Sequence, residues 1–554
     1  MVILLAVIVQ HHNGFAHLKH ALQVRSVGSG VLDYGTMGTI LKRLELVTVK
    51  PNDFNRFKPN GQQEDDLETI VFQKKRQVGD YVYVANPEGS IHYRSTALLV
   101  DKKTKPGWPI VSIATDEAFL HDPETGILAN RAEKGRAWEK IADISYIENG
   151  EVLFETRAGL RMHGGLRLST GEYTPGFRLY FRKKYGLAEV PSGLILPDLE
   201  IPLRTVVLQT SAWPPGYPLN NPIAYDIARH IGGIVPTTRL VEIYLNGKPY
   251  SMGFATEHLS RRQWGQRYGD TDYFFVKYRS KNPEVDLIDY RRKINHLLDR
   301  NTVLSVENVS EELDLSNLTA QVIAWSFCGT SDYYQGVAVG RKEPGSRIFW
   351  ITWDMDHSFW DEGVTENIDR AAWQQPAFER FFQQTAHRIC WRTDLFSRLI
   401  WQDQDYQSIF LMEVNKVLNH LLTPSYLDSL LSSYREKLAA YGDPHDHYFE
   451  LLETFFDNRP AFIRQELQTI LSLNDPATCR ITIPEDVEIL VDGFPYHDNY
   501  QGVYFNNTPV TLELADSSTL SDYYWLVNNE KRSGRHLELT INKDTEIALI
   551  AAAR

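Results

Sequence analysis

Two aspartates separated by a single residue follow an apolar run in the middle of the chain. Asp354 and Asp356 end the segment 348–353, which has the composition of a buried strand. Because side chains alternate between the two faces of a strand, we expect both carboxylates on the same face. Paired carboxylates suit a hard divalent cation such as Mg²⁺, which keeps water molecules for a substrate phosphate. The pattern therefore predicts a metal site for phosphate chemistry, while nucleotide-sugar transfer and a structural turn remain alternatives.

A third acidic residue precedes this pair. Asp332 lies in the loop 329–336, and a predicted hairpin leads from this loop to Asp354. An acid in a catalytic loop, then a hairpin, then a metal-binding aspartate is the order found in kinase-type phosphoryl transfer. The order alone is a weak signal, but it indicates which acids belong to one site.

Arginines flank a pair of glycines in the first half of the chain. Gly164 and Gly165 follow Arg161, and Arg178 comes after a polar loop, in a second predicted strand. Paired glycines let backbone N–H groups approach a phosphate, and arginines can pair with it. The segment is a candidate phosphate-binding site, with a plain β-turn as the alternative. Glu257, which follows a later predicted hairpin, is either a functional carboxylate or a solvated strand end.

Strands must position these residues in the first half of the chain. Runs rich in Val, Ile and Tyr, separated by Asn, Gly and Pro, are typical of short strands. Asn246-Gly247 between two such runs is the strongest short signal for a β-hairpin. A charged linker at 102–107 follows a predicted small β-domain at 22–105. The predicted strands are 44–50, 81–85, 91–100, 108–116, 142–148, 151–155, 177–181 and the hairpin 239–255.

Helices dominate the second half. Ile223, Ile227 and Ile231 recur at helical spacing after Pro222, which predicts a helix over 221–232. The remaining predicted elements are a helix at 315–327, strands at 336–340 and 347–353, helices throughout 376–473, and strands from 479 to the end.

Composition excludes several classes of protein. Apolar residues make up 43% and charged residues 23% of the 554 positions, which is the balance of a folded globular protein. The net charge of −13 leaves no basic surplus for a nucleic-acid interface. No apolar run reaches the roughly 20 residues that a membrane span requires. The three cysteines, Cys328, Cys390 and Cys479, form neither a zinc-ligand pattern nor a disulfide framework and are expected as small buried residues.

The first residues are ambiguous. The segment 1–9 is apolar, and small residues at Gly14 and Ala16 suit a cleavage point, but no Lys or Arg precedes them. Residues 1–21 are therefore either an export signal or a first strand. The former predicts an extracellular or cell-envelope location, and the latter leaves a cytoplasmic one open.

Several segments occur in one order that resembles a known family. They are 109–127 with its Asp-Pro-Glu-Thr-Gly turn, 161–165, 177–186, 219–229, 241–250, Glu257, Asp332 and 353–356. In this order the set resembles the spore coat protein H (CotH) kinase-like family. It looks most similar to exported bacterial members that carry small flanking β-modules. The resemblance covers residues 108–470.

This resemblance implies an α+β fold. An atypical protein-kinase-like core of two lobes, with a helical C-terminal half, is expected at 106–475, flanked by small all-β domains, the second at 476–554. By resemblance, the core binds ATP and Mg²⁺ and phosphorylates serine or threonine on a partner protein.

The resemblance also assigns roles to the candidate residues. Asp332 matches the catalytic-loop acid, which orients or deprotonates the acceptor hydroxyl. Asp354 and Asp356 match the acids that hold Mg²⁺, and Gln335 stands where members tend to have a second metal ligand, an asparagine. Glu257 is expected at the hinge between the lobes, near the adenine. The strands expected to cover the nucleotide contain Arg161, Gly164, Gly165 and Arg178.

Two departures from the family pattern keep a second function open. Many members carry a lysine where this chain has 174–176, Thr-Pro-Gly, and Gln335 replaces the asparagine. The chain is then either a kinase or a catalytically inactive secreted or surface scaffold whose β-modules bind polysaccharide or another envelope component. Mg²⁺-dependent ATP binding distinguishes the two.

Overall fold

A computed structural model describes residues 71–75, 79–84 and 95–99 and then most of 108–551. The segments 165–173, 211–218, 278–285, 332–335, 360–370, 383–390 and 516–522, with shorter gaps, lie outside the described residues. The chain divides into two compact units. The barrel unit comprises 1–218, 237–268 and 437–444, and the helical unit comprises 219–236, 269–436 and 445–554.

Seven strands of the barrel unit close on themselves in the order β10-β8-β7-β6-β5-β4-β9. Neighbouring strands are antiparallel, except that β4 pairs parallel with β9 and so closes the ring. Alternate side chains such as Ile144, Leu160 and Leu179 fill the interior. The strands are β4 (Ile110–Ala114), β5 (Lys140–Glu148), β6 (Glu151–His163), β7 (Gly176–Tyr180), β8 (Thr205–Thr210), β9 (Thr238–Leu245) and β10 (Lys248–Glu257).

The predicted hairpin is confirmed as β9 and β10, and Asn246 at its turn has a φ of 48°, the left-handed conformation that such turns require. The sequence predicts neither β8 nor the closure. Short helices α4 (Glu117–His121) and α6 (Arg261–Tyr268) and the 3-10 turn η3 (Arg136–Trp138) complete this unit around the barrel.

A three-stranded antiparallel sheet precedes the barrel. It consists of β1 (Val71–Lys75), β2 (Gly79–Val84) and β3 (Ser95–Leu99), so the strands predicted at 81–85 and 91–100 are confirmed. The strand predicted at 44–50 and the ambiguous segment 1–21 lie outside the described residues.

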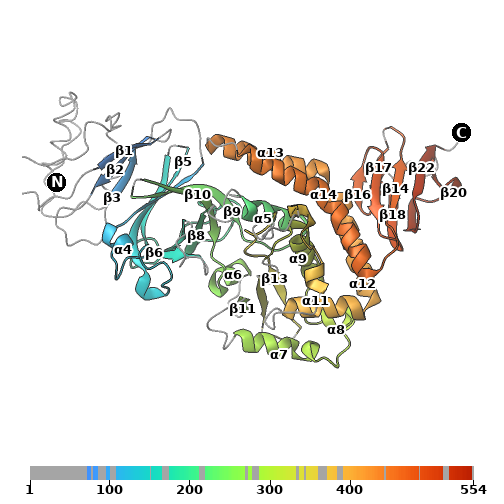
Figure 1. Cartoon of the computed structure of the whole chain (residues 1–554), viewed down its shortest axis with the longest axis horizontal. Coiled ribbons are helices and arrows are strands. Elements are labelled where there is room, and N and C mark those ends of the chain that lie inside the picture. Colours follow the sequence, from blue (N-terminus) through green and yellow to red (C-terminus); the bar gives the residue numbers. More distant parts are fainter. Residues whose placement is uncertain are drawn as a thin grey trace, which may run out of the picture. The chain divides into compact units, whose positions relative to one another are not determined.

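The helical unit contains a small sheet and most of the helices (Figure 1). The sheet has the order β11-β12-β13 and is antiparallel. Its strands are β11 (Tyr273–Lys277), β12 (Val337–Arg341) and β13 (Phe349–Ile351). The helices predicted at 221–232, 315–327 and across 376–473 are confirmed. In order, they are α5 (Asn220–His230), α7 (Asp286–Leu298), α8 (Val306–Ser310), α9 (Leu315–Cys328), η6 (Ala372–Gln374), α10 (Glu379–Phe382), α11 (Trp391–Gln402), α12 (Gln404–Lys416), η7 (Val417–Leu421), α13 (Pro424–Tyr441) and α14 (Asp446–Leu471).

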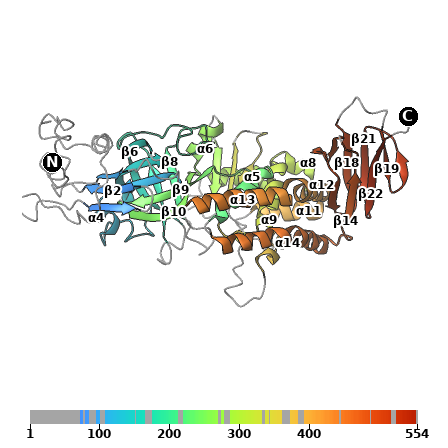
Figure 2. The same cartoon turned by 90° about the horizontal axis from the view of Figure 1, so that it is seen from above.

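Helices α13 and α14 run side by side in both views (Figure 2). Arg435 of α13 pairs with Glu453 of α14 and its guanidinium lies over the Phe449 ring. None of the described helices is long and apolar enough to cross a bilayer. Cys328 and Cys479 are buried free thiols, as expected, whereas Cys390 lies outside the described residues.

The C-terminal strands form a two-sheet sandwich within the helical unit. One sheet has the order β17-β14-β22-β19-β20 and the other β16-β15-β18-β21. Residues from both sheets, among them Cys479, Leu512 and Trp525, share one hydrophobic core. The strands are β14 (Ala477–Thr482), β15 (Ile489–Val491), β16 (Phe494–Tyr496), β17 (Tyr500–Tyr504), β18 (Thr508–Leu514), β19 (Tyr523–Val527), β20 (Glu530–Arg532), β21 (His536–Ile541) and β22 (Thr545–Ala551).

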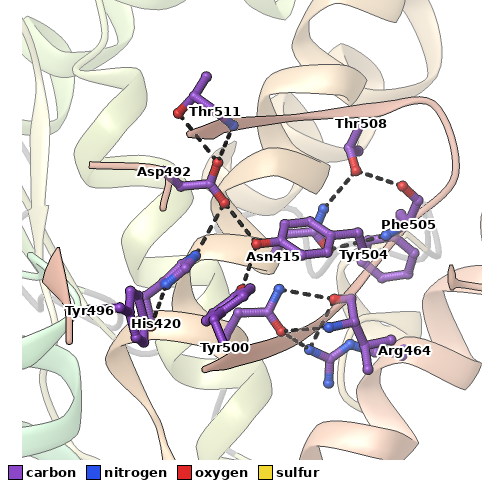
Figure 3. A network of polar contacts seen from close by, with 12 residues as sticks. Asn415, His420, Arg464, Asp492, Tyr496, Tyr500, Tyr504, Phe505, Thr508 and Thr511 are labelled. Carbon is purple, nitrogen blue, oxygen red and sulfur yellow. Dashed lines mark hydrogen bonds and ion pairs between the residues drawn. The ribbon is translucent and has the colours of Figure 1, made fainter. Parts of the chain in front are cut away.

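Polar contacts hold this sandwich against α12, η7 and α14 (Figure 3). The Asn419 side chain accepts from Val503 N–H and donates to Val503 O, and Arg464 donates to the same carbonyl. His420 bonds to Asp492 in the β15–β16 turn. The α+β class is thus confirmed with a closed barrel that the sequence does not predict, whereas the two-lobed kinase-like arrangement stays a prediction.

Candidate active site

Helix α5 presents a polar first turn followed by an apolar body. Ile223 and Ile227 are fully buried, and Pro222 suits the first turn because its missing N–H has no partner there in any helix. Asn220, Asn221 and Tyr225 are also buried, although their side chains are polar. Buried polar groups must be hydrogen-bonded, so these three side chains should have defined partners.

Their partners are main-chain groups of the segment 354–358, which we call the acidic loop. Asn220 Nδ2 donates to Asp356 O (3.1 Å) and Ser358 O (2.6 Å). Asn221 Oδ1 accepts from Met355 N–H at 2.6 Å, and the Tyr225 hydroxyl accepts from Asp354 N–H at 3.1 Å. One turn and a half of a single helix therefore fixes the backbone that carries both aspartates.

The two aspartates lie after the strand rather than on it, which corrects the prediction from alternation. Strand β13 ends at Ile351, and Thr352 N–H bonds to Ile234 O, outside the ladder. Asp354 then has a φ of 64°, a left-handed conformation that costs about 1 kcal/mol or more for a residue other than glycine. Beyond Thr352, the backbone donors of Asp354 and Met355 bond to side chains of α5 rather than to a strand. Met355 is fully buried between the two half-buried aspartates.

Negative charge accumulates at this loop. Burial and the charges of Asp354 and Asp356 raise the pKa of Tyr225 well above its usual range, so its hydroxyl stays neutral. Asp356 Oδ1 is itself buried. A site with two carboxylates and a neutral neighbour favours a cation, and oxygen donors of this kind fit Mg²⁺.

The described residues contain no group of three or more His, Cys, Asp or Glu side chains arranged to hold a metal ion. A complete ligand set would thus need further donors, and the predicted ones, Asp332 and Gln335, lie outside the described residues. The chain immediately before Asp332 is close to the acidic loop. Ser331 Oγ lies 3.0 Å from His357 Nδ1, and Phe359 N–H donates to Cys328 O at 2.8 Å.

In the barrel unit, Arg161 and Arg178 are direct neighbours across β6 and β7. Arg161 is paired with Glu139 and lies over the Tyr180 ring. The Glu139 carboxylate, almost fully buried, also accepts from Arg182 at 3.0 Å. Sequence reasoning missed Glu139. Gly159 of β6 leaves room for the Glu139 side chain, since a Cβ at that position would lie 2.6 Å from Glu139 Cγ, but nothing in the sequence indicates this contact.

Opposing effects act on Glu139. Burial alone would raise its pKa, but hydrogen bonds from Arg182, Arg161 and Tyr185 outweigh burial and hold the pKa below its ordinary value of 4.5. Because the folded-state pKa is depressed, this carboxylate stabilises the fold above the unfolded-state pKa, and that contribution is lost as the pH falls through the folded-state value.

We therefore expect Glu139→Gln to destabilise the barrel unit by about 2 kcal/mol at pH 7, because it leaves Arg161 and Arg182 without their shared anion. The difference from the wild type should shrink steadily as the pH falls below 4.5. Urea unfolding at several pH values measures this. Glu133→Gln, at an exposed position of the same unit, is the control and should change little at any pH. A loss for Glu139→Gln that is independent of pH would contradict the ion-pair explanation.

The other predicted nucleotide-binding residues have defined positions. Arg178 donates to His163 Nδ1 through Nε, at 2.9 Å. The two terminal nitrogens of its guanidinium take no part in this hydrogen bond. Gly164 follows His163 with a φ of 143°, a value that favours glycine, and Gly165 lies outside the described residues. The structure thus places Arg161, Arg178 and Gly164 at one end of β6 and β7.

Glu257 is not a solvated strand end. Its side chain is fully buried, accepts from Thr237 N–H at 3.0 Å and pairs with Arg267 at 3.2 Å. Its predicted contact with adenine stays a prediction. Glu257 belongs to the barrel unit and the acidic loop to the helical unit.

Residues 196–469 match the family model described as CotH kinase protein. The matched range contains Asn220, Asn221, Tyr225 and the acidic loop, and it begins after Arg161 and Arg178. No curated protein matches the chain.

Proposed function

We propose that this chain, in which residues 196–469 match the CotH kinase family model, is an atypical protein kinase that transfers the γ-phosphoryl group of ATP to serine or threonine of a partner protein. The observation that carries the proposal is the acidic loop, whose backbone is fixed by three buried side chains of α5. Preorganised charge is what phosphoryl transfer requires, because positioning and electrostatics supply most of its catalysis.

Within this proposal each group has a distinct task. Asp354 and Asp356 would hold Mg²⁺, with Gln335 as a further oxygen donor, and the bound ion would neutralise phosphate charge. Asp332 would accept the proton of the acceptor hydroxyl as its oxygen bonds to the γ-phosphorus and ADP leaves. Asn220 and Asn221 keep the two carboxylates in place, so the site does not reorganise when substrate binds. Arg161, Gly164, Gly165, Arg178 and Glu257 are the proposed nucleotide contacts.

Thermal and urea unfolding with ATP, with and without MgCl₂, tests the proposal. At a ligand concentration a hundredfold above Kd, we expect a gain in unfolding free energy of about 2.7 kcal/mol with both present. The double variant Asp354→Asn/Asp356→Asn should abolish the Mg²⁺-dependent part of this gain. The double variant Asp428→Asn/Asp457→Asn, at exposed positions on α13 and α14, serves as the charge-matched control and should retain it.

No stabilisation at millimolar ATP with Mg²⁺ would contradict the kinase proposal. That result would favour the binding-only scaffold, in which the kinase-like region has lost its nucleotide.

A further inference from the structure

A fully buried arginine lies at the centre of the helical unit, and the proposed chemistry does not use it. Arg459 of α14 is 0% exposed. Its hydrogen bonds go to four main-chain carbonyls rather than to a carboxylate. Nε donates to Phe327 O at 3.1 Å, Nη2 to Ser326 O, and Nη1 to Trp373 O at 2.7 Å and Gln375 O at 2.6 Å.

Two of these carbonyls belong to the last turn of α9. The carbonyls at a helix C-terminus have no partner within the helix, and the helix dipole makes this end negative. Arg459 supplies both donors and positive charge there. Gly329, with a φ of 63°, ends the helix, and a Cβ at this position would lie 3.3 Å from Arg459 Nη2. The loop that carries Asp332 begins at this point.

The same helix end contacts the acidic loop. Cys328 O accepts from Phe359 N–H at 2.8 Å, and the Phe359 ring packs edge-on against Phe455 and Phe456 of α14. Arg380, from α10, donates to Thr330 O at 3.1 Å, one residue beyond Gly329. Arg459 therefore holds the C-terminal end of α9. The loop that begins at Gly329 starts from this end, and Phe359, directly after the acidic loop, bonds to it.

Burial makes this cation costly. It lowers the pKa of Arg459 to about 9, and the faces of Phe455 and Phe462 compensate only part of the lost hydration. A well-packed apolar residue would often be as stable as a buried charge. Helix packing alone thus gives little reason for an arginine, whereas fixing carbonyls at the start of a catalytic loop requires several donors in one plane.

We propose that Arg459 is a positioning residue for the candidate phosphoryl-transfer site: it fixes the C-terminal end of α9 and the start of the following loop at 329–331. Cys328 O and the Ser331 side chain connect this segment to Phe359 and His357, next to the two aspartates. This inference rests on the proposed function for its catalytic consequence. Its structural part, the fixed start of the loop, stands independently and has its own readout.

The test uses Arg459→Lys in the full chain, because lysine keeps the charge but cannot reach four carbonyls from one plane. The structural readout is amide hydrogen exchange of the peptide spanning 326–331, expected about tenfold or more faster in the variant. The functional readouts use MgATP alone. We expect its Kd to stay within about threefold of the wild type while the rate of ATP hydrolysis falls about tenfold or more, since positioning errors act on the rate.

Arg464→Lys is the matched control. Arg464 lies on the same helix and is partly buried, but it donates to Pro460 O of its own helix, to Asn419 Oδ1 and to Val503 O of the C-terminal sandwich, and not to α9 (Figure 3). This variant should loosen the sandwich contact and leave exchange at 326–331 and ATP hydrolysis unchanged. If Arg459→Lys does not fold, Gly329→Ala disturbs the same contact from the other side and should give the same pattern.

Unchanged exchange at 326–331 in a folded Arg459→Lys or Gly329→Ala variant would overturn the inference. So would a fall in ATP hydrolysis that Arg464→Lys reproduces in full. Failure of the wild type to bind MgATP would instead contradict the proposed function, and the exchange measurement would still decide whether Arg459 fixes the loop.

Discussion

Replacing Asn220 with alanine is expected to destabilise the helical unit by about 3 kcal/mol and to weaken binding of Mg²⁺ and ATP in the same protein. The Asn220 side chain is buried and donates to Asp356 O and Ser358 O while its Oδ1 accepts from the Tyr448 hydroxyl at 3.0 Å. Alanine removes all three of these buried hydrogen bonds. The free energy of unfolding in urea measures the loss of stability, and calorimetric titration with ATP and MgCl₂ measures the binding.

The matched control is Asn458→Ala. Asn458 lies on the exposed face of α14 and donates only to Thr454 O within its own helix, so its loss should cost less than about 0.5 kcal/mol. A large loss of stability for Asn220→Ala with unchanged MgATP affinity would show that the contacts of Asn220 support the fold but not the site. A loss below about 0.5 kcal/mol would contradict the role of Asn220 in holding the acidic loop.

Local patterns predict most of the elements that position this site. The isoleucine spacing of α5, the apolar run of β13 and the hairpin signal at Asn246 each depend on a few neighbouring residues, and the helix, the strand and the hairpin are each confirmed. Barrel closure depends instead on the parallel pairing of β4 with β9, for which neither strand carries a local signal. Parallel strands need a long connection rather than a short turn, so no local turn sequence marks which two strands pair.

The same distinction applies to the side chains of the site. Asp354 and Asp356 are recognisable because two acids after an apolar run are unusual. Asn221 is not, because its partner Met355 lies 134 positions away and is bound through a backbone N–H that any residue would offer. Glu139 was missed for a similar reason: its partners Arg161 and Arg182 lie on or after two other strands of the barrel. Candidate catalytic residues can be proposed from sequence, whereas the residues that position them become visible only in the fold.

The His420→Ala variant should also lose about 3 kcal/mol, in this case at the contact between the helices and the C-terminal sandwich. The His420 side chain is fully buried and stacks between Phe494 and Tyr500, at ring-centroid distances of 4.8 Å and 5.4 Å. A neutral imidazole satisfies both of its neighbours when Nε2 donates to Asp492 Oδ2 at 3.1 Å and Nδ1 accepts from the Tyr496 hydroxyl at 2.8 Å. Alanine removes both bonds and leaves a cavity between the two rings.

Urea unfolding followed by tryptophan fluorescence, to which the sandwich core residue Trp525 contributes, measures this effect. His447→Ala on α14 is the control, since 84% of that side chain is exposed and its removal should change the unfolding free energy by less than about 0.5 kcal/mol. Tyr504 and Thr511 also donate to Asp492, so this aspartate stays partly satisfied in the variant and the sandwich itself should remain folded. The variant then weakens the contact between the helices and the C-terminal sandwich, and not the sandwich itself. If His420→Ala unfolds with the wild-type midpoint, the sandwich is held by Asn419 and Arg464 instead, and substitution of these two residues would carry the loss.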